Sequence, residues 1–155
     1  MTAGTERRAG TRPPPESRHR AREAALQMLY QWEVGRASMF EVRQTFWIGD
    51  ADRGEPLAED LRAFATTLAD GVAAHVAELD PIIAEAAQHW RVERMNVMDR
   101  LVLRLAVYEF LHERATPANV IINEALELAR TFSGDDAVRF SNGILDAVKR
   151  KLGRE

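Results

Sequence analysis

The chain of 155 residues contains no cysteine, which excludes disulfide bonds and metal sites built on thiolates. The fold must therefore be held together by packing, as expected of a protein in a reducing cytosol. A chain of this length buries roughly 70% of the surface that its unfolded form exposes, so an ordinary hydrophobic core is sufficient. The length suits one domain or two closely packed halves.

Long apolar runs are also missing. The longest, Leu101–Leu111, is interrupted by Arg104 and Glu109 and is much shorter than the roughly 20 residues that a membrane helix needs. The basic N-terminus is not followed by the apolar segment of a signal peptide. The sequence thus predicts a cytoplasmic protein without membrane contact.

The motifs of common catalytic sites are absent as well. There is no glycine-rich phosphate loop, and the four histidines at positions 19, 75, 89 and 112 are too widely spaced for a standard helical metal pair. The acidic pairs Asp50/Asp52 and Asp135/Asp136 are interpreted as helix caps rather than as general acids and bases. We therefore expect a protein that is not an enzyme and that carries no metal and no cofactor.

Lysine is scarce, because only two of the 21 basic residues are lysines. Residues 1–22 hold six arginines and two acids, whereas the remainder is acidic, and the net charge is −3. The distribution predicts a basic arm on an acidic body. Arginine suits bidentate phosphate contacts, although a GC-rich coding sequence would also enrich it.

No segment has the alternating pattern of a strand, and the spacing of apolar residues predicts an all-α fold of about seven helices. Ser38 and Glu41 have the spacing of a capping box, and the segment 101–111 is apolar nearly all round, which places its helix at the centre of the molecule. Pro56, Pro81 and Pro117 are predicted to stand at helix starts. The first four expected helices cover residues 17–34, 39–47, 56–79 and 80–90. A fifth is capped by Asn96 and is apolar from Leu101 to Leu111, a sixth runs from Thr116 to Phe132, and a seventh carries apolar residues from Ala137 to Leu152.

The predicted organisation has a disordered arginine- and proline-rich arm at residues 1–16, because this segment contains the run Pro13–Pro15 and almost no apolar side chains. A single helical domain follows at residues 17–155. It is expected to divide into two packed subdomains at about 17–79 and 80–152.

Three stretches of the chain are RAREAALQMLYQW at 20–32, VLRLAVYE at 102–109, and a segment from Pro117 that contains INEALELAR at 122–130, Phe132 and FSNGILD at 140–146. In this order they resemble the NusB family of transcription antitermination factors, over residues 18–152. The third stretch is the specific one. The arm before Ser17 is longer than the family core, and the loop Gly49–Glu55 is expanded.

The resemblance implies two packed helical subdomains and no cofactor. It implies a partnership with a small-subunit ribosomal protein, called NusE in this role, and binding of a short single-stranded RNA element, boxA, in nascent ribosomal RNA transcripts. The complex would join the elongating RNA polymerase and suppress premature termination. Self-association into a homodimer that competes with RNA is a further expectation, because an unliganded aromatic surface favours pairing.

The resemblance and the chemistry of the side chains together give a set of predicted RNA-binding residues: Arg18, Arg20, Arg22, Tyr30, Asp136, Arg139 and Phe140. Arginines would contact phosphates, and an aromatic ring could stack on an unpaired base. The predicted partner-binding residues are Glu93 and Asp99.

Each of these residues also has a structural interpretation. Tyr30 could be half-buried at the subdomain seam, Phe140 has the register of a core residue, and Asp99 could simply favour the start of its helix. Gly143 is interpreted as a point of close helix approach and Asn142 as a buried hydrogen-bonding group.

Two functional alternatives remain open. Helical modules of this kind precede the catalytic domain of some ribosomal RNA cytosine methyltransferases, but a second domain and a cofactor loop are missing here. The other alternative is a purely protein-binding adapter, whose arginines would be incidental.

Overall fold

The computed structural model describes residues 15–48, 55–88 and 90–154, and side chains from residue 18 onward. Within these ranges it contains seven α-helices, one short 3-10 helix and no strand, which confirms the predicted all-α class. None of the described helices is long and apolar enough to cross a membrane. The elements are α1 (Pro15–Glu33), α2 (Met39–Thr45), α3 (Glu59–Ala74), α4 (Val76–Ala87), η3 (Val92–Arg94), α5 (Val97–His112), α6 (Ala118–Phe132) and α7 (Asp135–Leu152).

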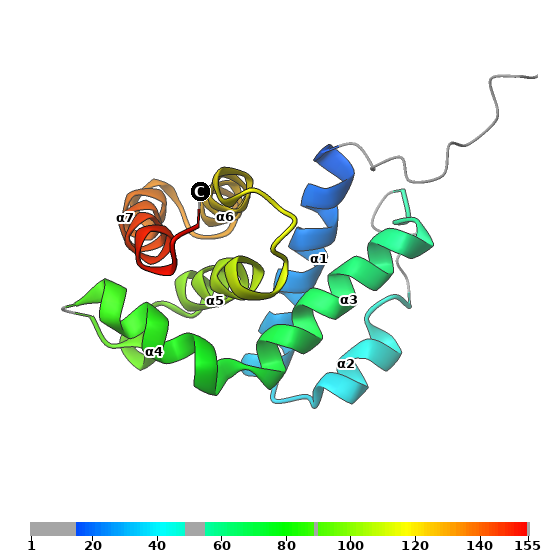
Figure 1. The fold of residues 1–155 in the computed structure, drawn as a ribbon. Coiled ribbons are helices and arrows are strands. Elements are labelled where there is room, and N and C mark those ends of the chain that lie inside the picture. The colour runs from blue at the N-terminus through cyan, green and yellow to red at the C-terminus, as the bar shows by residue number, and fades with distance from the viewer. Residues whose placement is uncertain (1–14, 49–54, 89, 155) are drawn as a thin grey trace, which may run out of the picture.

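Helix α5 lies at the centre of the molecule, as its lack of a polar face predicts. Figure 1 shows it nearly end-on, with α1, α2 and α3 to one side and α4, α6 and α7 around the rest of it, and α5 packs against α1, α3, α4, α6 and α7. Every residue from Leu101 to Phe110 is buried. Because a helix buried on all sides offers a surface to each neighbour, α5 joins the two groups of helices into one continuous hydrophobic core.

Helix α1 packs along α3 on one side and against α5 on another. Its inward stripe contains Ala21, Ala25, Met28 and Leu29, all of which are completely buried. The C-terminal end of α1 is fixed to α5 by Glu33, which accepts hydrogen bonds from Arg100 at 2.8 Å and Arg104 at 3.4 Å. One face of α1 thus packs in the core, and the opposite face is exposed.

The predicted helix caps at Ser38 and Asn96 are confirmed. The Ser38 hydroxyl accepts from the Glu41 amide, and the Glu41 carboxylate accepts from the Ser38 amide, which completes the capping box. The Asn96 side chain accepts from the Met98 amide at 2.9 Å. These bonds satisfy backbone donors that the first turn of a helix leaves without partners.

Two predicted helix starts are wrong. Pro56 lies before α3, which begins at Glu59, and Asp80-Pro81 lies inside α4 rather than at its start. The long third helix ends at Ala74, and α4 begins after the single residue His75. Asp80 does not cap α4, and its carboxylate instead accepts two hydrogen bonds from Arg104, each of 2.8 Å.

The remaining boundaries agree with the prediction to within a few residues. Helix α1 begins two residues earlier than expected, and α4 ends at Ala87 rather than at Trp90. The N-terminal arm up to residue 14 and the loop at residues 49–54 lie outside the described residues. We retain the division into two subdomains as a proposal, with the boundary moved to His75.

Candidate nucleic-acid and protein interface

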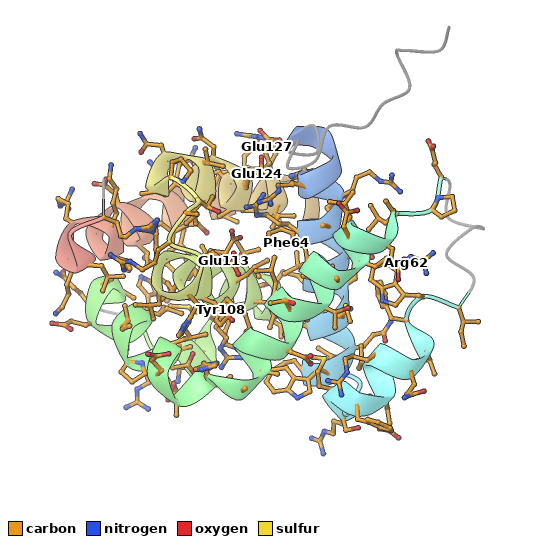
Figure 2. All side chains as sticks on the ribbon, turned by 45° about the vertical axis from the view of Figure 1, so that its right-hand side comes forward. Arg62, Phe64, Tyr108, Glu113, Glu124 and Glu127 are labelled. Atoms are coloured by element: carbon orange, nitrogen blue, oxygen red, sulfur yellow. The ribbon has the colours of Figure 1, made fainter. Side chains whose placement is uncertain are left out.

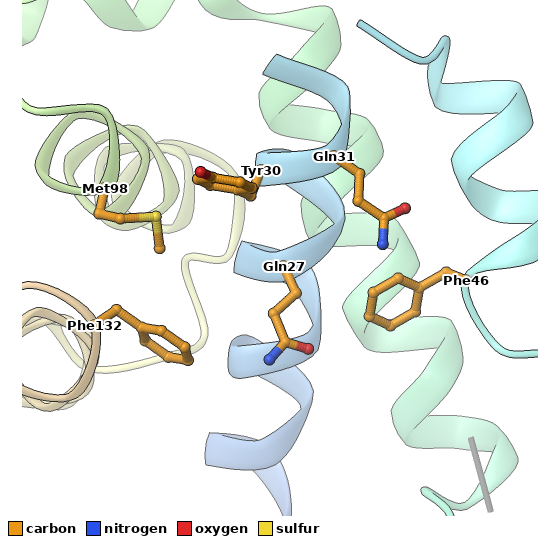
Figure 3. Close-up of a pocket in the computed structure, with 6 residues that line it drawn as sticks. All are labelled: Gln27, Tyr30, Gln31, Phe46, Met98 and Phe132. Carbon is orange, nitrogen blue, oxygen red and sulfur yellow. The ribbon is translucent and has the colours of Figure 1, made fainter. Parts of the chain in front are cut away.

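The outward face of α1 forms the floor of a groove. A hollow of about 510 Å³ lies over this face, between Phe46, just after α2, and Met98 and Phe132 on α5 and α6. Tyr30 lies in it with 41% of its surface exposed. Figure 3 shows how the side chains from the two sides approach α1, and we call this feature the α1 groove. It is lined by Gln27, Tyr30, Gln31, Phe46, Met98 and Phe132.

A second, smaller hollow continues the α1 groove toward the start of α1. It is bordered by Arg20, Glu23 and Trp47, and it shares Gln27 and Phe46 with the first hollow. Arg20 is exposed, and its guanidinium donates to the carbonyl oxygen of Glu55. Arg20 and Tyr30 therefore lie on one helix face about 15 Å apart along the axis, at 1.5 Å of rise per residue.

Arg18 packs against an aromatic ring. Its guanidinium carbon lies 4.6 Å from the ring centroid of Phe64, and its Nε atom is buried without a hydrogen-bond partner in the described structure. Figure 2 shows Phe64 on α3, beside α1. A cation on the face of an aromatic ring is stabilised electrostatically, so Arg18 has one role within the protein already.

Arg22 has the wrong position for the RNA-binding role predicted for it. Only 2% of its surface is exposed, and its Nε and Nη2 atoms each donate to the Glu109 carboxylate at 2.8 Å. Glu124 adds a second negative charge at 3.8 Å. Glu109 is a buried carboxylate on α5, and Arg22 is the cation that compensates it. We correct the assignment: Arg22 is a residue of the core.

The first two turns of α7 present a second exposed surface. Arg139 and Asp136 form a 2.8 Å ion pair that is almost entirely in solvent. Phe140, which is partly buried, meets Trp90 edge to face with 5.7 Å between ring centroids, and Trp90 is 57% exposed. Phe140 therefore combines the two interpretations, since one part packs on the core and the other joins an aromatic surface.

Asn142 and Gly143 are exposed, and the interpretation of both as packing residues is wrong. A Cβ atom added at Gly143 would meet no atom within 4 Å, so no neighbouring helix requires glycine there. Together with Arg139 these residues form an exposed stretch on the outer face of α7. The physical reason is register, because positions 139, 142 and 143 fall opposite the buried Ala137, Ser141 and Ile144.

One of the two predicted partner-binding residues lies next to the α1 groove. Asp99 stands in the first turn of α5, directly after the groove residue Met98, and its carboxylate accepts from the Ser133 hydroxyl at 2.6 Å. Glu93 is exposed on η3. Asp99 thus connects the α1 groove to the turn that leads into α7.

Sequence reasoning missed several residues of these surfaces. Gln27, Phe46, Met98 and Phe132 line the α1 groove, and Trp90 completes the aromatic pair of α7. The polar Gln27 and Gln31 share a helix face with Tyr30, and this spacing could have indicated an exposed stripe. The other residues come from distant segments, and no local pattern could have found them.

Comparison with known proteins gives the family. The NusB family profile matches residues 19–150. The chain belongs to the NusB family. The transcription antitermination protein NusB of Koribacter versatilis is 45% identical over 90% of this chain and 92% of its own length. A T. maritima NusB structure is 29% identical, covers 91% of this chain and 94% of its own, and superimposes with a TM-score of 0.76.

A structure described as the antitermination factors NusB and NusE in complex with dsRNA has the same fold, with a TM-score of 0.75 at 23% identity over 88% of this chain and 98% of its own. NusB membership confirms the recognised resemblance and the helical architecture. It also supports the expectation of a factor rather than an enzyme, because the relatives bear the name of an antitermination protein.

Proposed function

We propose that this protein is a transcription antitermination factor that binds a boxA-type single-stranded RNA in nascent ribosomal transcripts, together with the ribosomal protein NusE, and joins the elongating RNA polymerase. The observation that carries the proposal is that family membership over residues 19–150 coincides with an exposed aromatic and arginine-bearing surface. A cytoplasmic location follows from this role.

The surface of α7 suits unpaired bases. Single-stranded RNA exposes base faces that stack on aromatic side chains. Trp90 and Phe140 offer such faces, and Arg139 stands beside Phe140 with its guanidinium paired to the exposed Asp136. A phosphate can replace that carboxylate at small cost, because exposed ion pairs contribute little. Gly143 leaves room for a nucleotide to approach the helix closely.

The α1 groove suits a second segment of the ligand. Arg20 at one end offers a phosphate contact, and Tyr30 at the other offers an aromatic ring. We retain Arg18, Arg20, Tyr30, Asp136, Arg139 and Phe140 as proposed RNA-binding residues and leave out Arg22. Asp99 and Glu93 remain the proposed contacts for the ribosomal protein.

The decisive experiment is a fluorescence-anisotropy titration of labelled RNA with this protein, alone and with the ribosomal protein. The probes are a boxA-type single strand, a scrambled strand of equal length, and a duplex. We expect the single boxA-type strand to bind tightest and the ribosomal protein to strengthen binding. Equal weak binding of all three RNAs, with a tight protein complex, would support the protein-binding adapter instead.

Self-association stays a prediction. If a dimer covers the same aromatic surface, added RNA should dissociate it. Sedimentation velocity at several protein concentrations, with and without the boxA-type strand, checks this. A dimer that binds RNA with unchanged stoichiometry and affinity would contradict it.

A further inference from the structure

Three potential metal ligands meet where α3, α4 and the end of α5 come together. His75 is the single residue between α3 and α4, Glu78 stands in the first turn of α4, and His112 is the last residue of α5. One ligand atom from each residue lies within 4.8 Å of the others. The wide spacing of the histidines in the sequence argued against a metal site. The fold nevertheless brings His75, directly after α3, close to His112, at the end of α5.

The ring of His75 is oriented by the backbone. Its Nδ1 atom lies 2.7 Å from the carbonyl oxygen of Gly71. A carbonyl oxygen can only accept, so Nδ1 carries the hydrogen, and in the neutral ring Nε2 keeps its lone pair. Metal-binding histidines commonly have this arrangement, in which a hydrogen bond from one ring nitrogen fixes the tautomer of the other.

The other two ligands are already at a suitable spacing. His112 Nε2 lies 3.1 Å from Glu78 Oε1. Nitrogen and oxygen ligands bind zinc at 2.0–2.1 Å, so two ligand atoms at a tetrahedral ion are about 3.3 Å apart. The ion would therefore fit between His112 and Glu78 with little movement of either side chain.

The ring of Tyr108 lies close to the rings of both histidines. Its ring centroid lies 5.7 Å from that of His75 and 4.7 Å from that of His112, and the two imidazole centroids are 4.8 Å apart. Figure 2 shows Tyr108 on α5 with Glu113 nearby.

We propose that His75, Glu78 and His112 bind one divalent transition-metal ion of the zinc type. Two imidazoles and one carboxylate are a ligand set that zinc accepts, with a fourth position left for water. Glu78 and His112 are exposed, so the ion can enter from solvent. The bound ion would connect the α3–α4 junction to the end of α5 and stabilise the folded chain, because the unfolded chain does not hold the three ligands together.

The test uses the full chain without a histidine tag, treated with a chelator and dialysed. Zn²⁺ is added in a calorimetric titration, and thermal unfolding is followed with and without the ion. A parallel titration with Co²⁺ reports the ligand geometry by visible absorption. We expect one ion per chain and a higher unfolding temperature. The variants His112→Gln and Glu78→Gln should each weaken binding at least about tenfold, since even loss of a residue that only orients a ligand costs that much.

Glu85→Gln is the matched control, because Glu85 is also an exposed glutamate of α4 but pairs with Lys151 instead. It should bind Zn²⁺ like the unchanged chain. Millimolar or weaker binding by the unchanged chain would overturn the proposal, as would unchanged binding by the double variant Glu78→Gln/His112→Gln. Circular dichroism of each variant before titration shows that it is folded, and the decision rests on these two exposed positions rather than on His75.

Discussion

The ion pair between α1 and α5 and the ion pair on α7 have the same chemistry and the same length, and they differ in what surrounds them. Arg22 and Glu109 meet at 2.8 Å with 3% and 2% of their side chains exposed. Arg139 and Asp136 also meet at 2.8 Å, with 78% and 98% exposed. The first pair cannot exchange partners without opening the core, whereas the second can exchange a carboxylate for a phosphate at once. Burial, and not residue type, separates a structural arginine from one that can bind a ligand.

Electrostatics supports this contrast. Desolvation by burial lowers the pKa of the Arg22 guanidinium, but the hydrogen bond and charge of Glu109, with the charges of Glu124 and Glu113, outweigh it and raise the pKa above its ordinary value. Arg104, paired with Asp80 and Glu33, shows the same balance. Both arginines are therefore charged at any physiological pH, and each needs its acidic partner in place.

Removing one member of the buried pair should have the largest effect. Glu109→Ala leaves the Arg22 charge buried without its main partner, and we expect a loss of about 3–5 kcal/mol in the free energy of unfolding. Urea denaturation followed by circular dichroism measures it. The double variant Arg22→Met/Glu109→Leu is the control and should lose much less, because it buries no unpaired charge. Equal losses in both would contradict the argument.

On the exposed side, Phe140→Ala should weaken binding of the boxA-type strand by about 1–3 kcal/mol if the ring stacks on a base, with the salt dependence nearly unchanged. Phe40→Ala is the matched control, because Phe40 is an exposed phenylalanine on α2, away from α7. Unfolding of the Phe140 variant would instead show that its packing against the core is its main role.

Arg20→Ala sharpens the comparison with Arg22, two positions away on the same helix. Loss of one phosphate contact should weaken all RNAs alike and reduce the slope of log K against log salt by about 0.7. Anisotropy titrations at several salt concentrations measure the slope. Arg150→Ala removes an exposed arginine from the last turn of α7, far along the helix from Arg139, and should leave this slope unchanged.

The exposure of Asp99 lies between those of the buried and the exposed ion pair, since Asp99 is partly buried and hydrogen-bonded to Ser133. Asp99→Lys should slow association with the ribosomal protein through charge reversal at the rim, while stability changes by less than about 0.5 kcal/mol. Stopped-flow association kinetics measure the rate. Asp99→Asn removes the charge but keeps an acceptor for Ser133, so it should slow association less than Asp99→Lys. Unchanged association of both variants would mean that Asp99 only favours the start of its helix.

Much of the fold could be predicted from local patterns. The central position of α5 followed from its missing polar face, and the starts of α2 and α5 followed from capping residues. Local sequence patterns could not show that Arg20 is exposed and Arg22 is buried, because both residues flank the same apolar stripe. One signal was present: Glu109 sits in a helix that must be buried, so a cation from elsewhere had to reach it.

The α3–α4 junction shows where local reasoning fails. A proline after an aspartate is typical of a helix start, but Asp80 and Pro81 lie inside α4, where Asp80 pairs with Arg104, and the break between the two helices falls at His75 instead. The α1 groove and the Trp90–Phe140 pair join residues from separate helices. Their existence depends on how the helices pack, which single-sequence patterns do not specify.

The contact between Gly71 and Tyr108 restricts the order in which this protein can change during evolution. A Cβ atom at position 71 would lie 2.1 Å from the Tyr108 ring, so even alanine requires that the ring move. Replacing Tyr108 by a smaller residue would remove this clash and leave room for a side chain at position 71. The two positions are therefore expected to vary together.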